Sequence, residues 1–279
     1  MARFVSIMGM AHAPGVTGWI EATPAHERAA IEAGYDELGR IMDRAKPDVI
    51  IGVANDHMLN LPLKHPPHWC VGTAPEWDGP AEFFKAWLKQ PGYHVAGNSE
   101  IATLIHREAQ ADGVDIDARG DLLFDDNWSV PLWYLGYDFP LVPIHMNCIN
   151  PPVPTPQDCV HFGKVLRRIV REVLPSHLRV GLIATGGLSH EPGGPRYFTL
   201  DPAFDRWFLD LMEESDEARV VREATVERMN AAGGGGTTEL LAWMVAMAAA
   251  GGTHGRTTFY VGSKEMRCGI GATVWETFQ

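Results

Sequence analysis

Residues 180–194 read VGLIATGGLSHEPGG, an apolar run followed at once by glycines, a histidine and a proline. A short apolar run bounded by such turn residues predicts a buried strand with a sharp exit loop. Glycine suits that exit because it lacks a Cβ atom and adopts bends that other residues avoid. We therefore expect His190 to lie on a tight loop at a strand end, although Ser189 and His190 would also suit a plain turn.

The same order of strand, loop and histidine occurs twice more in the chain. Residues 4–15 read FVSIMGMAHAPG and residues 49–57 read VIIGVANDH, so that His12 and His57 each follow an apolar run. In open α/β sheets, binding sites form in the crevice beyond the carboxyl ends of the strands. We predict that His12, His57 and His190 converge on one such crevice, although each alone would also suit a hydrogen-bonded turn or core position.

Helical and strand patterns alternate along the chain. Between Pro24 and Pro47, apolar side chains recur at helical spacing, which predicts a helix that ends before Pro47. Further predicted helices cover residues 83–88, 101–111, 162–173, 218–229 and 237–247, and further strands cover residues 141–147, 257–261 and 270–275. The alternation predicts an α/β fold, a single domain over residues 1–279 whose central mixed sheet is covered by helices on both faces. We expect an irregular loop at residues 61–80 and a polar turn at residues 125–131.

Composition narrows the classes of protein. Hydrophobic residues make up 46% of the chain and charged residues 21%, which is typical of a globular protein. A formal net charge of −12 without a basic stripe argues against nucleic acid as a partner. The four cysteines are scattered, no run reaches the roughly 18 apolar residues of a membrane span, and we find no signal-peptide pattern. We expect a cytoplasmic protein that does not bind membranes.

Glu239 supplies a carboxylate at the start of another predicted helix, after four glycines in residues 233–240, GGGGTTEL. A carboxylate there interacts favourably with the helix dipole and needs no other role. Together with two histidines, however, it would form the ligand set of a facial triad, which leaves positions open on ferrous iron. The same ligand types serve zinc in hydrolases, so the set alone does not distinguish the two metals. A histidine outside the set, such as His190, would be free for acid–base catalysis.

Four stretches together resemble the landmarks of class III extradiol ring-cleavage dioxygenases: GMAHAP (9–14), NDH (55–57), GGLSH (186–190) and GGGGTTEL (233–240). They occur in the family's order and span nearly the whole chain. The likeness is greatest to the catalytic beta subunit of protocatechuate 4,5-dioxygenase and to gallate dioxygenases.

This resemblance implies a ligand set and a reaction. His12, His57 and Glu239 would bind Fe(II), and His190 would be the catalytic acid–base residue. The reaction implied is that of a non-haem iron dioxygenase, which uses O2 to cleave a catechol-type ring, with or without a ring carboxylate, next to the chelating oxygens. The family also implies a homo-oligomer, which in some relatives pairs with a small helical subunit.

One stretch departs from the family's pattern. Residues 125–131 read DDNWSVP, which puts Asp126 where relatives carry a second histidine. Asp126 either caps a turn or lines a pocket altered for an aminophenol, a hydroxypyridone or another non-catechol ring. His145, at the end of a predicted strand, is either a core histidine or a replacement proton donor. Asp126 and His145 are therefore our candidate substrate-binding residues.

Two further questions stay open at this level. We expect a ring carboxylate of the substrate to be bound by one of four basic residues, which would also suit solvated surface positions: Lys64, His65, His68 and Arg196. Besides the dioxygenase, a zinc hydrolase on the same scaffold and a non-enzymatic relative that binds a partner in the crevice would both fit the pattern.

Overall fold

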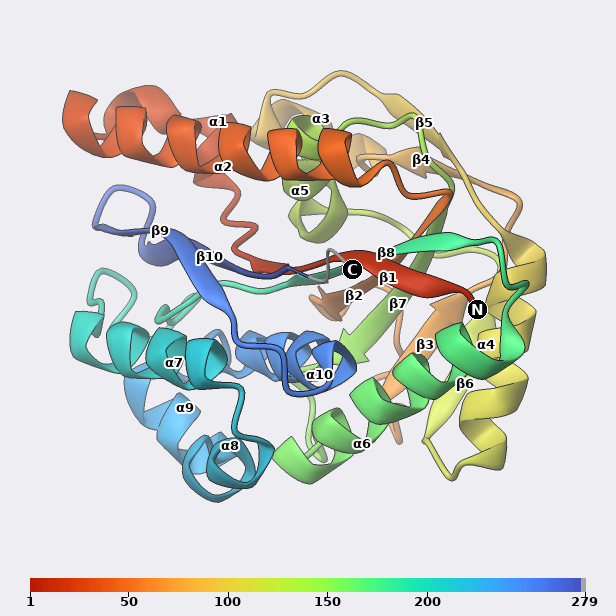
Figure 1. Ribbon diagram of the computed structural model, residues 1–279. Coiled ribbons are helices and arrows are strands. Elements are labelled where there is room, and N and C mark those ends of the chain that lie inside the picture. Colours follow the sequence, from red (N-terminus) through yellow and green to blue (C-terminus); the bar gives the residue numbers. More distant parts are fainter. Residues whose placement is uncertain (277–279) are drawn as a thin grey trace.

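The computed structural model describes residues 1–276, which form a large mixed sheet between two layers of helices (Figure 1). The sheet has eight strands in the order β6-β3-β7-β2-β8-β1-β10-β9. Their bounds are β1 Arg3–Met10, β2 Val49–Asp56, β3 Trp69–Gly72, β6 Ile116–Arg119, β7 Leu141–Asn147, β8 Arg179–Thr185, β9 Arg256–Ser263 and β10 Cys268–Trp275. A second sheet pairs β4 (Glu76–Gly79) with β5 (Tyr93–Ala96). The predicted α/β fold with a mixed central sheet is confirmed.

Four central strands, β7, β2, β8 and β1, run parallel to one another. Their carboxyl ends meet at one edge, because Met10 of β1 pairs with Thr185 of β8 and Val53 of β2 pairs with Ala184. Every residue of β2 is buried, as expected for a parallel strand covered on both faces. The predicted strand-end histidines therefore belong to one edge of the sheet.

Helices cover the two faces separately (Figure 1). On one side lie α1 (Gly15–Gly18), α2 (Ala25–Ala45), α3 (Glu82–Leu88) and α5 (Asp126–Leu135), and on the other lie α4 (Ser99–Ala111), α6 (Pro156–Arg168), α7 (Pro202–Glu214), α8 (Glu217–Glu223), α9 (Val226–Ala232) and α10 (Leu241–Ala250). Successive strand residues face different layers: Ile7 packs in the core under α6 and α10, whereas Met8 packs in the core under α2. Every residue of α10 is buried, so this apolar helix forms the centre of its layer.

Local sequence signals explain several helix ends. α2 begins after Pro24 and ends where Lys46 adopts the left-handed conformation, just before Pro47. α6 begins with a capping box between Thr155 and Asp158. Three short irregular helices complete the chain: η1 (Ile20–Ala22), the π-helical turn η2 (Ile169–Val173) and η3 (Thr237–Leu240).

Three predictions of local structure were wrong. Residues 61–80 are not wholly irregular, because they contain β3 and β4. Residues 125–131 do not form a turn: Asp125 accepts a hydrogen bond from the backbone N–H of Asn127 (2.8 Å) and caps α5, which accommodates Pro131 within it. The single helix expected at 218–229 is divided into α8 and α9, because Thr225 starts a new helix as its N-cap. The segments that form β5, β6 and α7 had not been assigned.

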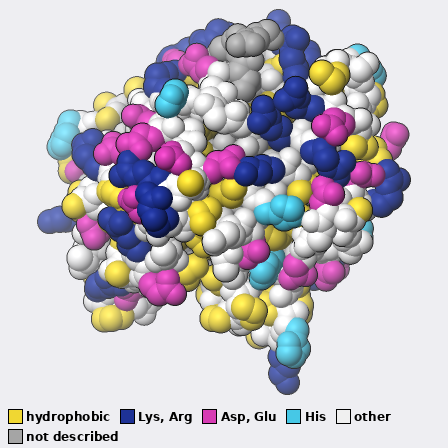
Figure 2. All heavy atoms as spheres, turned by 60° about the horizontal axis from the view of Figure 1, so that its bottom comes forward, with side chains coloured by type: hydrophobic (Ala, Val, Ile, Leu, Met, Phe, Trp, Pro, Cys, Tyr) yellow, Lys and Arg dark blue, Asp and Glu magenta, His cyan; other side chains and the backbone are white. Residues whose placement is uncertain are grey.

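The surface mixes charges of both signs. On the face drawn in Figure 2, basic side chains lie among acidic ones. Pairs such as Arg168 with Asp112 (2.8 Å) and Arg219 with Glu223 (3.2 Å) show the same alternation at close range. Within residues 1–276, no helix combines the length and apolar character needed to cross a membrane.

Candidate metal centre

The three predicted histidines and Glu239 line one cavity of about 300 Å³ at the carboxyl edge of the sheet. His12 follows β1, His57 directly follows β2, and His190 lies on the glycine-rich loop after β8. Glu239 reaches the same point from η3, where its carboxylate contacts Gly187 of that loop. The predicted convergence of the strand-end histidines is therefore present in the structure.

The Glu239 carboxylate lies at the centre of the three imidazole rings. Its Oε2 atom is 3.3 Å from His12 Nε2, and its Oε1 atom is 3.3 Å from both His57 Nε2 and His190 Nε2. The backbone N–H of Gly187 donates to Oε2 at 2.7 Å. Burial raises the pKa of Glu239, but His190 and His12 lower it well below its usual value, so the group is a carboxylate.

This donor set fits a metal ion. Charge-assisted N–H···O bonds are usually about 2.7–2.9 Å long, so three contacts of 3.3 Å around one carboxylate are long for hydrogen bonds. Two ligands bound at right angles to an ion, each at about 2.1 Å, lie about 3 Å apart. Nδ1 of buried His12, the ring nitrogen that does not contact Glu239, has no hydrogen-bond partner among the described residues.

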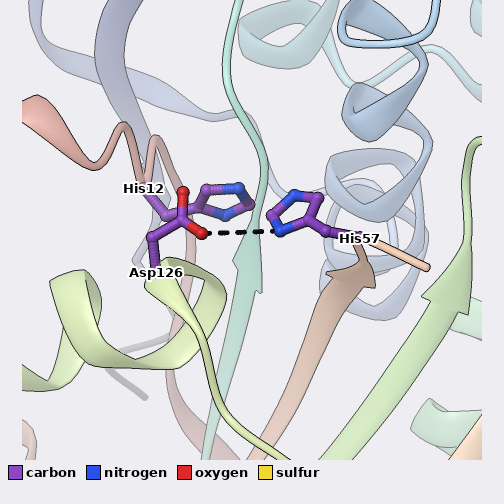
Figure 3. A group of neighbouring side chains, drawn as sticks. All are labelled: His12, His57 and Asp126. Carbon is purple, nitrogen blue, oxygen red and sulfur yellow. Dashed lines mark ion pairs between the residues drawn. The ribbon is translucent and has the colours of Figure 1, made fainter. Parts of the chain in front are cut away.

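Two further carboxylates, those of Asp125 and Asp126, face the other ring nitrogen of His57, Nδ1. Its Nδ1 atom lies 3.0 Å from Asp125 Oδ2. The same atom lies 3.5 Å from Asp126 Oδ1, the contact drawn in Figure 3. A carboxylate on one imidazole nitrogen orients the ring and increases the basicity of the other nitrogen. Burial lowers the pKa of His57, whereas Asp125 and then Asp126 raise it well above its usual value.

Carboxylates thus face both ring nitrogens of His57. Glu239 faces Nε2, and ligand atoms of His12, His57 and Asp126 also lie within 4.8 Å of one another (Figure 3). Burial and then the neighbouring Asp125 raise the pKa of Asp126, whereas His57 lowers the pKa of Asp125 against the effect of burial. The geometry therefore offers either Glu239 or Asp126 to an ion held by the two histidines.

His190 is fixed through one ring nitrogen and presents the other. Its Nδ1–H donates to the carbonyl oxygen of Leu188 at 2.8 Å, which turns Nε2 towards Glu239. A Cβ atom on Gly187 would lie 2.8 Å from His190 Cε1, and one on Gly236 would lie 2.7 Å from Cδ2. Both neighbours must therefore be glycine for the two loops to close on the ring. Burial lowers the pKa of His190, but Cys268 and Glu239 raise it well above its usual value.

His145 does not line the cavity, contrary to our expectation of a substrate contact. It is fully buried within β7, where Nε2 accepts a hydrogen bond from Trp128 Nε1 (3.0 Å) and Nδ1 lies 3.3 Å from Asp56 Oδ1. Burial raises the pKa of Asp56, but the hydrogen bond from His145 lowers it to about 2. His145 thus supports the loop after β2 from the core. Asp126, the other substrate-binding candidate, does line the cavity.

The four basic residues expected to meet a ring carboxylate also lie elsewhere. Lys64, His65 and His68 do not line the cavity. Arg196 is paired with Glu191 at 2.6 Å and also donates to backbone carbonyl groups at the end of α9. Arg267 does line the cavity, although no motif in the sequence marks it, because it lies in a turn between two strands.

Residues 6–268 match the family described as the catalytic LigB subunit of aromatic ring-opening dioxygenase. The chain belongs to this family. The resemblance found in the four sequence stretches is thereby confirmed over nearly the whole chain.

Individual members of the ring-opening dioxygenase family align over different lengths. A gallate dioxygenase of Pseudomonas putida is 30% identical over 156 residues, which are 54% of this chain and 45% of that protein. A 2,3-dihydroxyphenylpropionate/2,3-dihydroxicinnamic acid 1,2-dioxygenase of Rhodococcus globerulus is 25% identical over 73% of this chain and 62% of that protein. The chain thus spans less than two thirds of the length of these two relatives. An enzyme of the same printed name from Burkholderia vietnamiensis is 24% identical over 94% of both chains.

Among solved structures, an uncharacterized protein of Escherichia coli K12 shares the fold. It superposes with a TM-score of 0.59 over 97% of this chain and 99% of that chain, at 14% sequence identity. At this identity the likeness concerns the fold alone.

Proposed function

We propose that this protein is an extradiol ring-cleavage dioxygenase that uses Fe(II) and O2 to open a catechol-type aromatic ring. The observation that carries the proposal is the Glu239 carboxylate, which faces Nε2 of His12, His57 and His190 at 3.3 Å inside one cavity. Membership of the ring-opening dioxygenase family supports the reaction class.

In this proposal His12, His57 and Glu239 hold the metal. Asp126 is the weaker candidate, since it faces Nδ1 of His57, where Asp125 is already closer (3.0 Å against 3.5 Å). Two imidazoles and one carboxylate leave several positions open on the ion. When bound, ferrous iron supplies a Lewis acid and a redox centre at which an aromatic diol and O2 are brought together.

His190 acts as the general base and later as the general acid. Because its Nδ1–H is committed to the carbonyl oxygen of Leu188, proton exchange takes place at Nε2. Once the Glu239 carboxylate is neutralised by a cation, it no longer favours a proton on Nε2, and this nitrogen is free to accept one from a ring hydroxyl. The proton then returns to the opened product.

The remaining walls orient the ring and exclude water. Phe84, Trp87, Ile149 and Met266 give the cavity an apolar surface that suits the faces of an aromatic substrate. Asp126 accepts a hydrogen bond from a polar substituent of the ring. Because a carboxylate accepts readily from an amino group, a 2-aminophenol is the second candidate substrate, in place of a diol.

Further proposals concern the whole protein. We propose that residues 1–279 act as one catalytic domain in a homo-oligomer, with or without a small helical subunit. Phe83 and Trp87 support this, because these large apolar side chains on α3 are 65% and 45% exposed. The four unpaired, buried cysteines support a reducing, cytoplasmic location.

The test combines metal analysis with oxygen uptake. The protein is purified without air, its metals are measured, and uptake is followed with catechol, 3,4-dihydroxybenzoate and 2-aminophenol. We expect about one iron per chain and uptake that depends on one of these rings. Zinc without uptake would favour a hydrolase instead, and the absence of any metal would favour a binding protein.

A further inference from the structure

Arg267 is the only lysine or arginine that lines the cavity among the residues that the structure describes. It lies in the turn between β9 and β10, directly before Cys268. The Cys268 thiol and the His190 ring both pack against Gly187, because a Cβ atom on this glycine would lie 2.8 Å from the sulfur and from the His190 ring. Arg267 is therefore attached to the wall of the proposed catalytic centre.

The turn that carries Arg267 is held on two sides. The indole N–H of Trp19 donates to the carbonyl oxygen of Glu265 at 3.1 Å, and Met266 is 3% exposed. Arg267 itself has φ of 59°, a left-handed conformation that costs energy in a residue other than glycine. Such a conformation persists only where the surrounding contacts enforce it, so the backbone of the turn at Arg267 is held in place.

The guanidinium group is positioned by aromatic rings and has no acidic partner. It donates to the Tyr197 hydroxyl, and its Cζ atom lies 4.5 Å from the Tyr197 ring centre and 5.0 Å from that of Phe198. Within residues 1–276 no carboxylate lies within 4.0 Å of it, unlike Arg196, which is paired with Glu191. Arg267 thus has no acidic partner in the described part of the chain, although the chain has 35 acidic and only 23 basic residues. Most of its five N–H donors are therefore available to a ligand in the cavity.

We propose that Arg267 binds a carboxylate substituent of the ring substrate, so that the enzyme selects aromatic acids. This inference rests on the proposed function. Asp125, Asp126 and Glu239 line the same cavity and repel an anion from their side, whereas Arg267 attracts it. The acidic side chains and Arg267 would together orient the ring, with its hydroxyl groups towards Glu239 and its carboxylate towards Arg267. The net charge of −12 provides no general attraction for an acid, so the attraction has to be local.

The test compares substrates of equal size and different charge. We would measure kcat/KM for 3,4-dihydroxybenzoate and 3,4-dihydroxybenzamide, and repeat this with 3-(2,3-dihydroxyphenyl)propionate and its amide for a longer acid arm. In Arg267→Gln the acid-to-amide ratio should fall by about 10- to 100-fold, the range for a hydrogen bond to a charged group. Arg267→Lys should show a smaller fall, because lysine keeps the charge without the planar fork.

Lys264→Gln is the matched control, since it removes the same charge three residues away from an exposed side chain outside the cavity. Its ratio should stay within about twofold of the parent, as expected for a screened surface charge. Thermal unfolding verifies that the variants fold, and Arg267→Lys carries the test if Arg267→Gln does not fold. Ring cleavage with an unchanged ratio in the folded Arg267 variant would overturn the inference and leave the proposed function intact.

A second readout does not need turnover. Calorimetric titration of 3,4-dihydroxybenzoate and its amide without oxygen should show a weaker Kd in Arg267→Gln for the acid only. If no ring is cleaved but this difference in binding is present, the proposed function fails and the role of Arg267 stands. Equal binding of the acid and the amide by the parent protein, or no binding of either, would overturn the role of Arg267.

Discussion

His145 and His190 both lie near the carboxyl ends of central strands, yet they belong to different parts of the molecule. His145 is within β7, where Asp56 and Trp128 take both its ring nitrogens and no part of it is exposed. His190 follows β8 by five residues, where Leu188 takes one nitrogen and the other faces Glu239 in the cavity. A strand residue points into a helix-covered layer, whereas a loop residue beyond the strand reaches the crevice.

This contrast between a core histidine and cavity histidines predicts different consequences of mutation. The largest effect is expected at the proposed ligands. His12→Ala and His57→Ala should each lose iron on gel filtration and lose ring cleavage, because each removes one of three protein ligands. The fold should survive, as judged by circular dichroism. Iron content equal to that of the parent in both variants would show that these histidines are not ligands.

The next effect separates His190 from those ligands. His190→Ala should keep its iron and still bind substrate, while turnover falls by about 10²- to 10⁴-fold, the range for a lost general acid–base group. His190→Gln keeps a hydrogen bond but cannot exchange a proton, so it should be nearly as slow. Loss of iron in His190→Ala would make His190 a ligand, and unchanged turnover would remove it from the mechanism.

Asp125 tests whether the carboxylate behind His57 matters for metal binding. Asp125→Asn keeps the size of the side chain but removes the charge 3.0 Å from His57 Nδ1. Metal affinity should fall by about 10- to 100-fold, as is typical when the carboxylate behind a metal-bound histidine is lost. A chelator competition titration measures this, and an affinity unchanged from the parent would contradict the orienting role.

The smallest effect on turnover is expected at His145. His145→Ala removes the acceptor of the Trp128 N–H and one partner of Asp56 and leaves a cavity in the core, so it should lower the free energy of unfolding by about 2–4 kcal/mol. Turnover per folded molecule should fall far less than in His190→Ala. Urea denaturation with an activity assay tests both statements, with exposed His26→Ala as the control. A fully stable His145→Ala that loses turnover as His190→Ala does would reverse the assignment.

The contrast also explains which features could be predicted from sequence. Continuous apolar runs predict the three strands that are buried on both faces, β1, β2 and β8. His12, His57 and His190 follow these runs, so their places at strand ends could be predicted as well. β4 and β5 could not be predicted in this way, because half of each short strand is exposed and the pattern is weak. The start of α5 resembles a turn in the sequence, because Asp125, its N-cap, is also a typical turn residue.

The positions of single side chains were harder to predict. The sequence around His145 looks like another strand end, and only the pairing of β7 with β2 shows that the ring is enclosed beside Asp56. Arg267 reaches the cavity because β10 pairs antiparallel with β1 and brings the preceding turn to the carboxyl edge. Both depend on contacts between distant segments, which periodicity along the chain does not encode.

The most direct test of the proposed metal site is which carboxylate completes it, Glu239 or Asp126. Glu239→Gln and Asp126→Asn each remove one charge with little change in volume, and iron per chain can be measured in both after anaerobic loading. We expect Glu239→Gln to lose its iron and Asp126→Asn to retain about one iron per chain, because Glu239 faces Nε2 of both proposed ligand histidines, whereas Asp126 faces Nδ1 of His57. Iron retained in Glu239→Gln and lost in Asp126→Asn would contradict this expectation.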